Sequence, residues 1–126
     1  MVTQGRLRLV LRARAELDIA EALGHYISES APAAEGFVNA LGRAFAHIRR
    51  APATGSPRWA HELQIPGSRS WPCARFPYLA LYMLLPERIE VWRVLHGKRD
   101  IPAWLNLISN EPQPVESSAA AAARSG

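Results

Sequence analysis

The chain has 126 residues, 48% of them hydrophobic, and this length supports one domain with one core rather than two independent domains. Fifteen lysines and arginines outnumber eleven aspartates and glutamates, which gives a formal net charge of +4. All but one of the basic residues are arginines, which favour contacts with carboxylates and phosphates. Net charge alone does not choose among RNA, DNA and an acidic protein as the partner.

The cysteine and histidine content argues against several classes of protein. Cys73 is the single cysteine, so no internal disulfide can form, as is typical of a protein in a reducing cytoplasm. The four histidines match no zinc-ligand spacing, and we expect neither a metal nor another cofactor. No G-x-S-x-G, Walker or Rossmann glycine motif occurs, so no catalytic residue is assigned. No apolar stretch reaches the roughly 18 residues of a membrane span, and we expect a cytoplasmic protein.

The first half of the chain predicts a strand and two helices. In residues 6–12 leucines alternate with arginines, the period of a strand with one buried face. Residues 16–30 have helical apolar spacing, and a second helix follows with Pro32 in its first turn and Arg49 and Arg50 in its last. The apolar positions of the first helix are Ile19, Leu23, Tyr26 and Ile27. Two such helices predict a hairpin whose apolar face lies on a sheet.

The second half supplies that sheet. After a loop rich in proline and glycine, we expect strands in the segments HELQI (61–65), RSWPCARF (69–76), YLALYMLL (78–85) and IEVWRVLH (89–96). Pro72 has no amide donor, so its strand should lie at an edge or contain a bulge. Residues 78–85 are apolar on both faces, as in a central strand. The predicted fold class is α+β, with a helical hairpin packed on a small antiparallel β-sheet of three to four strands.

Arg93 lies in the last of these strands. It is the charged residue whose neighbours can be predicted best from the alternation of side chains along a strand. Strand alternation puts it on one face with Ile89, Val91 and Leu95, and a charge among apolar groups needs a carboxylate partner. Asp18, Glu21 and Asp100 are the candidate partners. The faces of Arg69 and Arg75 stay open, because a one-residue slip in register turns every side chain of a strand over.

Two further interpretations are left open by the residues alone, and a third feature, the C-terminal tail, is predicted from composition. His96 ends the last strand beside Lys98 and Arg99, and a structural and a functional histidine fit equally well. The four tryptophans are expected to pack in the fold, although aromatics interspersed with arginines could also bind single-stranded nucleic acid. Residues 109–126 turn to proline, serine and alanine, which predicts a disordered tail behind a domain of residues 1–108.

The order of elements and several motifs resemble the ParE-type toxins of the ParE/RelE superfamily, the toxin half of bacterial type II toxin-antitoxin (plasmid-stabilisation) pairs. The segment IEVWRVLHGKRDIP (89–102) is close to the family ending Arg-Val-Leu-His-x-x-Arg-Asp-Ile. Shorter matches are ARAELDIAEALGHYI (13–27), AAEGFVNAL (33–41), Pro52 with Gly55, Arg58 with Glu62 and Leu63, and Arg69 ahead of RFPYLALY (75–82). The resemblance runs from about Leu7 to Leu105.

This resemblance implies a cognate acidic antitoxin, ParD-like or similar, that binds as an otherwise disordered segment and is the chain's only link to DNA. ParE-like relatives inhibit DNA gyrase without chemistry of their own, whereas RelE-like relatives cleave messenger RNA on the ribosome. The nuclease side chains are mostly missing, because RSWPC (69–73), Leu79 and AWL (103–105) occupy their positions and Arg99 alone has a counterpart. A gyrase inhibitor is therefore expected, with a ribonuclease or an inactive antitoxin-binding copy as alternatives.

The residues and the resemblance together predict two groups of site residues. The residues expected to bind the target or the antitoxin are Arg69, Arg75, His96, Lys98 and Arg99. The residues expected to form structural ion pairs are Arg93, Asp18 and Asp100, the last of which should also cap a short helix IPAWL (101–105).

Overall fold

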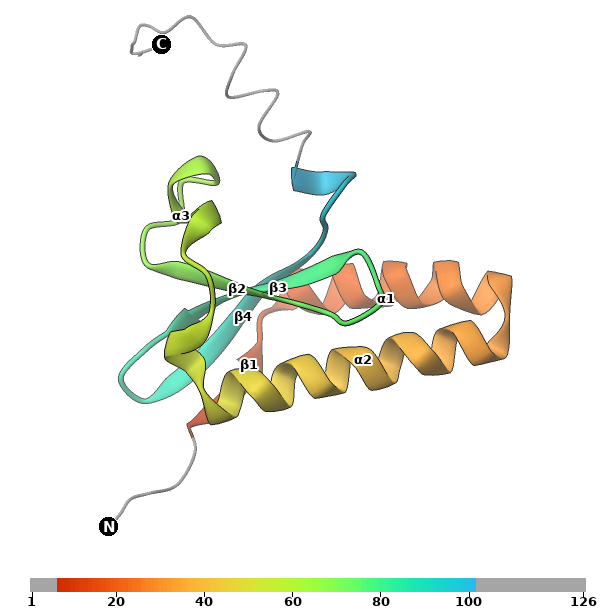
Figure 1. The fold of residues 1–126 in the computed structure, drawn as a ribbon, viewed down its shortest axis with the longest axis horizontal. Helices are drawn as coiled ribbons and strands as arrows, with labels where there is room; N and C mark the ends of the chain where they lie inside the picture. Colours follow the sequence, from red (N-terminus) through yellow and green to blue (C-terminus); the bar gives the residue numbers. More distant parts are fainter. Residues whose placement is uncertain (1–6, 102–126) are drawn as a thin grey trace, which may run out of the picture. The chain divides into compact units, whose positions relative to one another are not determined.

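The computed structural model of the protein describes residues 7–101 (Figure 1). The chain divides after His96, so residues 97–101 are described by themselves. The elements up to His96 are β1 (Arg8–Leu11), α1 (Ala13–Glu29), α2 (Ala31–Arg50), the 3-10 turn η1 (Pro52–Thr54), α3 (Arg58–Glu62), β2 (Ser68–Pro72), β3 (Tyr78–Leu84) and β4 (Arg88–His96). The predicted tail of residues 109–126 lies outside the described residues, and its boundary at residue 108 stays a prediction.

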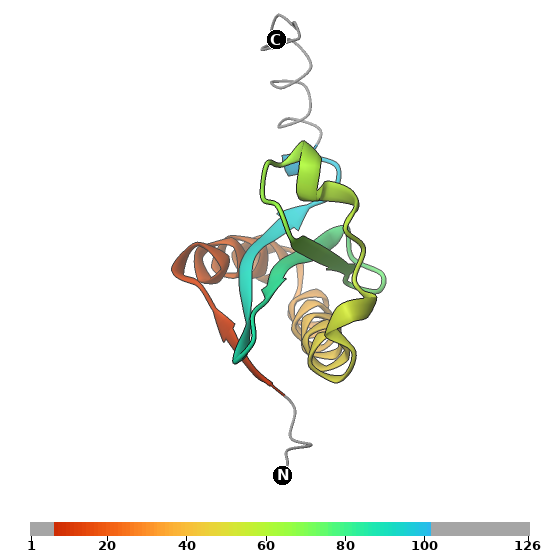
Figure 2. The same ribbon diagram turned by 90° about the vertical axis from the view of Figure 1, so that its left-hand side faces the viewer.

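The four strands form one sheet in the order β1-β4-β3-β2, with β1 at one edge and β2 at the other (Figure 2). Strands β2, β3 and β4 are antiparallel neighbours, whereas β1 pairs parallel to β4. The predicted α+β fold is confirmed, with the difference that the sheet is mixed. The parallel pair arises because the hairpin and two strands separate β1 from β4, which returns beside β1 in the same direction.

The helical hairpin forms as the apolar spacing predicts, and α1 and α2 run antiparallel to each other (Figure 1). Ser30 joins them, and its hydroxyl accepts a hydrogen bond from the amide of Ala33 at 3.0 Å, which caps the start of α2. Pro32 lies in the first turn, where its missing amide costs nothing. The predicted stripe of α1 is wrong at one position, because the side chain of Ile27 is 59% exposed.

The main core lies between the hairpin and the adjacent face of the sheet. Its largest fully buried members are Phe37 and Ile48 from α2 and Tyr82, Ile89 and Val91 from the sheet. The alternating leucines of the first strand pack against this core, as expected of a strand with one buried face. As predicted, β3 is internal and Pro72 lies in an edge strand. The strand predicted over residues 69–76 is too long, because β2 ends at Pro72 and residues 73–76 lie in the turn before β3.

The predicted strand at residues 61–65 is wrong. His61 and Glu62 belong to α3, and the amide of Ile65 donates to the carbonyl of Ala60 at 2.8 Å, which closes a helical turn. A short apolar run cannot be assigned to a strand or a helix from periodicity alone. The strand partner expected here is supplied instead by Ser56, which forms a bridge to Ser70 of β2.

A bulge in β4 changes which residues share a face. Tyr82 pairs with Val91 and Leu81 pairs with Arg93, so Trp92 is an extra residue opposite the bond between Leu81 and Tyr82. Val91 therefore faces the hairpin core, whereas Arg93 lies on the opposite face. The prediction that Arg93 shares one face with Ile89 and Val91 is wrong, because strand alternation is interrupted between them.

Candidate binding surface

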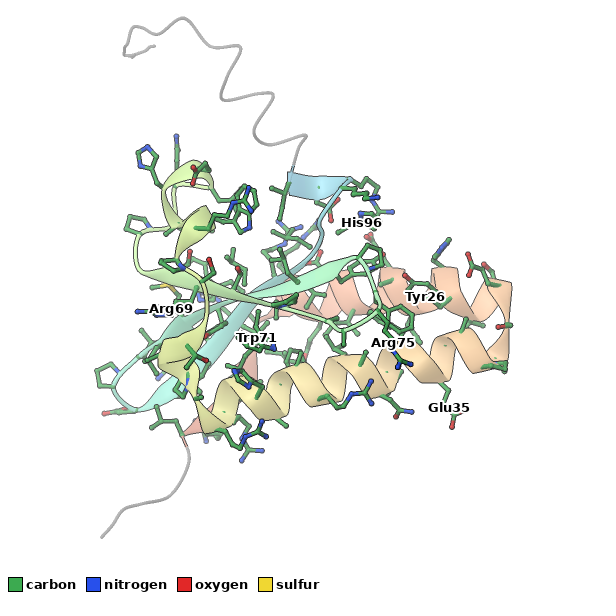
Figure 3. All side chains as sticks on the ribbon, viewed as in Figure 1. Tyr26, Glu35, Arg69, Trp71, Arg75 and His96 are labelled. Carbon is green, nitrogen blue, oxygen red and sulfur yellow. The ribbon has the colours of Figure 1, made fainter. Side chains whose placement is uncertain are left out.

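The residues predicted to bind a target or an antitoxin lie in different parts of the molecule. Arg69 of β2 is opposite Tyr82, in the half of the sheet next to η1. His96 is opposite Tyr78, at the end of the sheet where the β2–β3 turn carries Arg75. Figure 3 shows Arg75 and His96 at this end and Arg69 in the other half. The sheet thus separates two groups of candidate residues.

Arg69 belongs to a partly buried network that we call the Gly55 network, formed by Pro52, Gly55, Arg69 and Tyr82. The guanidinium Nη1 of Arg69 donates to the carbonyl of Gly55 at 2.8 Å, and the hydroxyl of Tyr82 donates to the carbonyl of Pro52 at 2.5 Å. Burial raises the pKa of the Tyr82 phenol, and the Gly55 amide and the charge of Arg69 partly oppose that rise. In this structure Arg69 holds a loop in place.

Gly55 is the position on which this network depends. A Cβ placed on Gly55 would lie 2.1 Å from the hydroxyl oxygen of Tyr82 and 2.8 Å from its Cζ. No side chain fits at such distances, because the backbone of the loop lies directly against the phenol ring. The Pro52 and Gly55 motif in the sequence therefore has a structural cause.

His47 and Trp71 tie the end of α2 to the same half of the sheet. Their rings stack at a centroid distance of 3.6 Å with an interplanar angle of 15°. The hydroxyl of Thr54 donates to the carbonyl of Ala51 at 2.7 Å and lies 2.9 Å from His47 Nε2. The single hydrogen of that hydroxyl is used in the bond to Ala51, so the Thr54 oxygen acts as the acceptor and His47 Nε2 as the donor in the bond between them. Trp71 packs within the fold, as expected.

The opposite end of the sheet carries an aromatic cluster of Tyr26, Phe37, Phe76, Tyr78 and His96. The Tyr26 ring from α1 lies 5.2 Å from the rings of Phe37 and Phe76, at centroid distances typical of aromatic pairs. The Tyr78 ring lies 5.4 Å from Phe37 and 5.1 Å from His96. The cluster joins both helices of the hairpin to the ends of β3 and β4, and it holds the His96 imidazole edge-on against a buried tyrosine.

Arg75 lies beside this cluster in the turn between β2 and β3, and not on a strand. Its side chain is exposed, and its backbone has a φ of 73°, in the left-handed region that favours glycine. The next residue, Phe76, packs over Gly36 of α2, where an added Cβ would lie 3.3 Å from the phenyl Cζ. The turn is therefore anchored by Phe76 while Arg75 projects from it in an unfavourable backbone conformation.

Arg93 and Asp18 form a bidentate ion pair between β4 and α1. The Arg93 Nε and Nη2 atoms donate to the two carboxylate oxygens at 2.8 and 3.2 Å, and the amide of Val94 donates to Asp18 Oδ2 at 2.9 Å. Asp18 is 7% exposed, and Arg14 lies 3.5 Å away at the helix surface. The Asp18 carboxylate thus accepts a hydrogen bond from a backbone amide of β4 and neutralises the charge of Arg93. Arg93 lies opposite the buried Leu81 on the outer face of the sheet.

Residues 97–101 contain the remaining predicted residues. Lys98 and Arg99 are exposed in a turn, and a helix begins at Asp100. The Arg99 Nε atom lies 3.5 Å from Asp100 Oδ1. Asp100 is therefore in the first helical turn, where a carboxylate is favoured by the helix dipole. The rest of the predicted helix 101–105 lies outside the described residues after Ile101.

The sequence interpretation missed a cluster on the outer face of β1 and β4, which we call the Glu90 cluster. Glu90 accepts hydrogen bonds from Arg88 Nε at 2.8 Å and from Trp92 Nε1 at 3.1 Å, and Arg12 Nη1 lies 3.6 Å away. The Arg12 guanidinium also lies 4.5 Å from the centroid of the Trp92 ring. These hydrogen bonds and charges lower the pKa of Glu90. The cluster depends on the parallel pairing of β1 with β4, which the sequence did not reveal.

The described residues offer few groups for covalent or metal chemistry. Burial raises the pKa of the Cys73 thiol to about 11, so the thiolate nucleophile is scarce at neutral pH. Within residues 7–101, no three histidine, cysteine or acidic side chains come together as a metal site. In the same range, no helix has the length and apolarity needed to cross a membrane. The arrangement is that of a four-stranded sheet with charged and aromatic groups around it.

Comparisons with known proteins agree with this architecture. Among solved structures, one described as the chromosomal ParDE TA system from P. aeruginosa superposes with a TM-score of 0.62 at 19% identity, covering 74% of this chain and 98% of the other. That similarity shows a shared fold. The curated protein sequences contain no significant match. The profile of the family described as the ParE toxin of the type II toxin-antitoxin system, parDE, matches residues 9–101, and the chain belongs to this family.

Proposed function

We propose that this chain arrests bacterial growth in the cytoplasm by binding DNA gyrase, and that a cognate acidic antitoxin neutralises it. The proposal rests on one observation, the match of the ParE toxin family over residues 9–101. The solved relative is named as part of a ParDE toxin-antitoxin system. In this proposal the chain acts as a binding inhibitor and carries out no chemistry of its own.

The proposed contact residues of the sheet are His96 and Arg75, which lie at one of its ends. Lys98 and Arg99 of the following segment are proposed separately, as exposed residues of a turn. Arg75 supports the assignment because its side chain is exposed in the β2–β3 turn, next to Phe76 of the aromatic cluster. His96 is held by the ring of Tyr78 in a fixed orientation. Arg69 is a weaker candidate than the sequence indicated, since its guanidinium is occupied by the Gly55 carbonyl.

The residues of the outer sheet face next to the β2–β3 turn favour a binding role over ribonuclease chemistry at that end of the sheet. Cleavage of RNA by its 2′-hydroxyl needs a base, an acid and a cation around one phosphate. The residues of this face next to the β2–β3 turn are Pro72, Leu79 and Leu95, which pair across the three antiparallel strands. None of these side chains can transfer a proton.

The test is growth after tight induction of this chain, with and without the protein encoded by the neighbouring reading frame. We expect growth arrest that the neighbour relieves, and accumulation of cleaved DNA when the purified chain is added to gyrase. Position-specific cleavage of messenger RNA with unaffected gyrase would contradict the proposed target. Normal growth at proven expression would contradict a toxic role.

The surface is tested with the same assay. Arg75→Ala and Arg99→Ala should each reduce toxicity or antitoxin affinity by about tenfold, the effect of losing a charged contact. Arg43→Ala is the matched control, because Arg43 is an exposed arginine in the middle of α2. An equal effect of all three variants would show that only net charge matters and would contradict the proposed surface.

A further inference from the structure

Two of the tryptophans contact an arginine at the surface of the fold. The Arg12 guanidinium lies 4.5 Å from the centroid of the Trp92 ring, and the Arg58 guanidinium lies 4.4 Å from that of Trp59. Arg12 is 52% exposed, and Trp92 is partly exposed. Nucleic-acid bases stack on aromatic rings and on the planar face of a guanidinium group. Each pair is therefore a candidate stacking site for a base of a single strand.

The Trp92 pair lies on the outer face of the sheet, beside further arginines of β1 and α1. The leucines of β1 pack against the core, so Arg8 and Arg12, which alternate with them, project from the opposite face. Arg14 follows in the first turn of α1 and is 58% exposed. Figure 2 shows β1 at the edge of the sheet, leading directly into α1. We call Arg8, Arg12 and Arg14 the arginine row.

The two carboxylates near the arginine row each have a closer partner than the row. Glu90 accepts a hydrogen bond from Arg88, and Asp18 accepts two from Arg93. The arginine row adds three exposed guanidinium groups to these two ion pairs. Its first member, Arg8, forms no ion pair with any of residues 7–101. The row therefore has an excess of positive charge beside a stacking face.

Other exposed arginines lack this combination. Arg49 and Arg50 lie in the last turn of α2, where the helix dipole favours cations. The second stacking pair lies on α3, which packs against β2, and Arg69 of that strand is already bound to the Gly55 carbonyl. Within the described part of the chain, the outer face of β1 and β4 is the place where a stacking face adjoins a row of exposed arginines.

We propose that the outer face of β1 and β4 binds a single strand of DNA. One base would stack on the face formed by Arg12 and Trp92, and the phosphates would contact the arginine row. Arg8 and Arg12 are four residues apart in an extended chain, about 13 Å, so the row spans more than one nucleotide. This contact is direct, in addition to the link through the antitoxin that the family resemblance implies.

The stacking face distinguishes this ligand from other polyanions. An acidic peptide would use the charges without needing the stacking face, and the bases of a duplex are not free to stack on a side chain. The face and the charges do not by themselves separate DNA from RNA. The choice of DNA rests on the proposed function, in which the target is an enzyme that acts on DNA.

The first test is binding of a labelled oligothymidylate to the purified full chain, measured by fluorescence anisotropy. An oligomer of about 12 nucleotides covers one site of the usual size. We expect the logarithm of the binding constant to fall with the logarithm of the salt concentration with a slope of about −2, as for three phosphate contacts on a single strand. A duplex of the same length should bind more weakly, and oligouridylate should bind no more tightly. Absence of binding or equal binding of the duplex would overturn the inference, and tighter binding of oligouridylate would overturn the choice of DNA.

A pair of variants tests the charges without altering the core. Arg8→Glu should weaken binding of the oligothymidylate about tenfold. Arg43→Glu makes the same change in net charge on α2 and should change the affinity less than about twofold. Both arginines are exposed, so both variants should fold. Equal losses would show a general charge effect and overturn the assignment to the arginine row.

A second pair tests the stacking face at constant charge. Arg12→Lys keeps the positive charge but loses the planar guanidinium group, and it should weaken binding about three- to tenfold. Arg58→Lys makes the same change in the pair on α3 and should leave the affinity unchanged. Equal affinities of the two variants would overturn the role of the Trp92 pair.

The binding assay and the growth assay separate this inference from the proposed function. A chain that arrests growth and acts on gyrase without binding the oligothymidylate would overturn the inference and leave the proposed function intact. A chain that binds the oligothymidylate through the arginine row without arresting growth would support the direct contact and contradict the proposed function.

Discussion

The two halves of the sheet hold their arginines in opposite ways. In the half next to η1, Arg69 is partly buried and its guanidinium donates to the Gly55 carbonyl. At the other end, Arg75 is exposed in a turn whose backbone has a positive φ. One arginine satisfies a loop of its own chain, while the other is the third residue of a turn closed by the hydrogen bond from the Phe76 amide to the Cys73 carbonyl, a position that takes a positive φ in type II turns. The comparison shows that two arginines of similar sequence context differ in this chain, since one is tied into the fold and the other is exposed.

The largest effect should come from Gly55→Ala, in the structural half. The added methyl group would lie far inside contact distance of the Tyr82 hydroxyl and ring, which are held by the buried core. We expect a loss of about 3 kcal/mol or more in the free energy of unfolding, measured by urea titration. Gly42→Ala is the control, because its Cβ meets no atom within 4 Å, and it should stabilise α2 by roughly 0.5–1 kcal/mol. A Gly55→Ala protein as stable as the parent would show that the loop is free to move.

The second effect is the loss of the ion pair that joins β4 to α1. Arg93→Met leaves Asp18 buried with the Val94 amide and the more distant Arg14 as its remaining partners. Breaking a buried pair in this way should cost about 2–3 kcal/mol, measured as the free energy of unfolding. Arg14→Met should cost less than about 1 kcal/mol, because that arginine is 58% exposed. Equal costs for the two variants would contradict the special role of Arg93.

Periodicity and composition predicted the elements that bury a regular stripe. The hairpin, the internal strand β3 and the edge position of Pro72 all follow from local pattern. The bulge at Trp92 could not be predicted, because an extra residue leaves no mark in the alternation of a single strand. Because of this bulge, the sequence analysis placed Arg93 on the wrong face of the sheet.

The contacts of the site depend on packing between distant segments. The chemistry of Arg93 called for a carboxylate, but only the fold places Asp18 on α1 against β4. The contact of Gly55 with Tyr82 and the Glu90 cluster likewise join segments whose register no sequence pattern determines. Short-range patterns therefore predict elements, whereas long-range contacts need the topology.

The third prediction separates strain from function at the surface end. Arg75→Gly should raise the stability by up to about 1 kcal/mol, since glycine adopts a positive φ without a steric cost. The same variant should reduce toxicity or antitoxin affinity, because the side chain is lost. Gln64→Gly is the matched control, with a φ of 59° after α3, and it should gain stability without losing activity. If Arg75→Gly were fully active, the surface role of Arg75 would be wrong.

The smallest effect on stability should come from Glu90. This residue belongs to neither of the two compared regions of the sheet, because its partners lie on the outer face of β1 and β4. Hydrogen bonds from Arg88 and Trp92 lower the pKa of this carboxyl in the folded state below the ordinary value of 4.5. A lowered pKa means that the ionised form stabilises the fold above about pH 4.5 and that this contribution is lost as the pH falls through the folded pKa. Glu90→Gln should therefore weaken the fold slightly at neutral pH and flatten its acid dependence, measured as thermal unfolding between pH 3 and pH 7 (an interval of about 4 units around the titration). Identical pH profiles for the variant and the parent would contradict a contribution of the ionised Glu90 carboxylate to the stability of the fold.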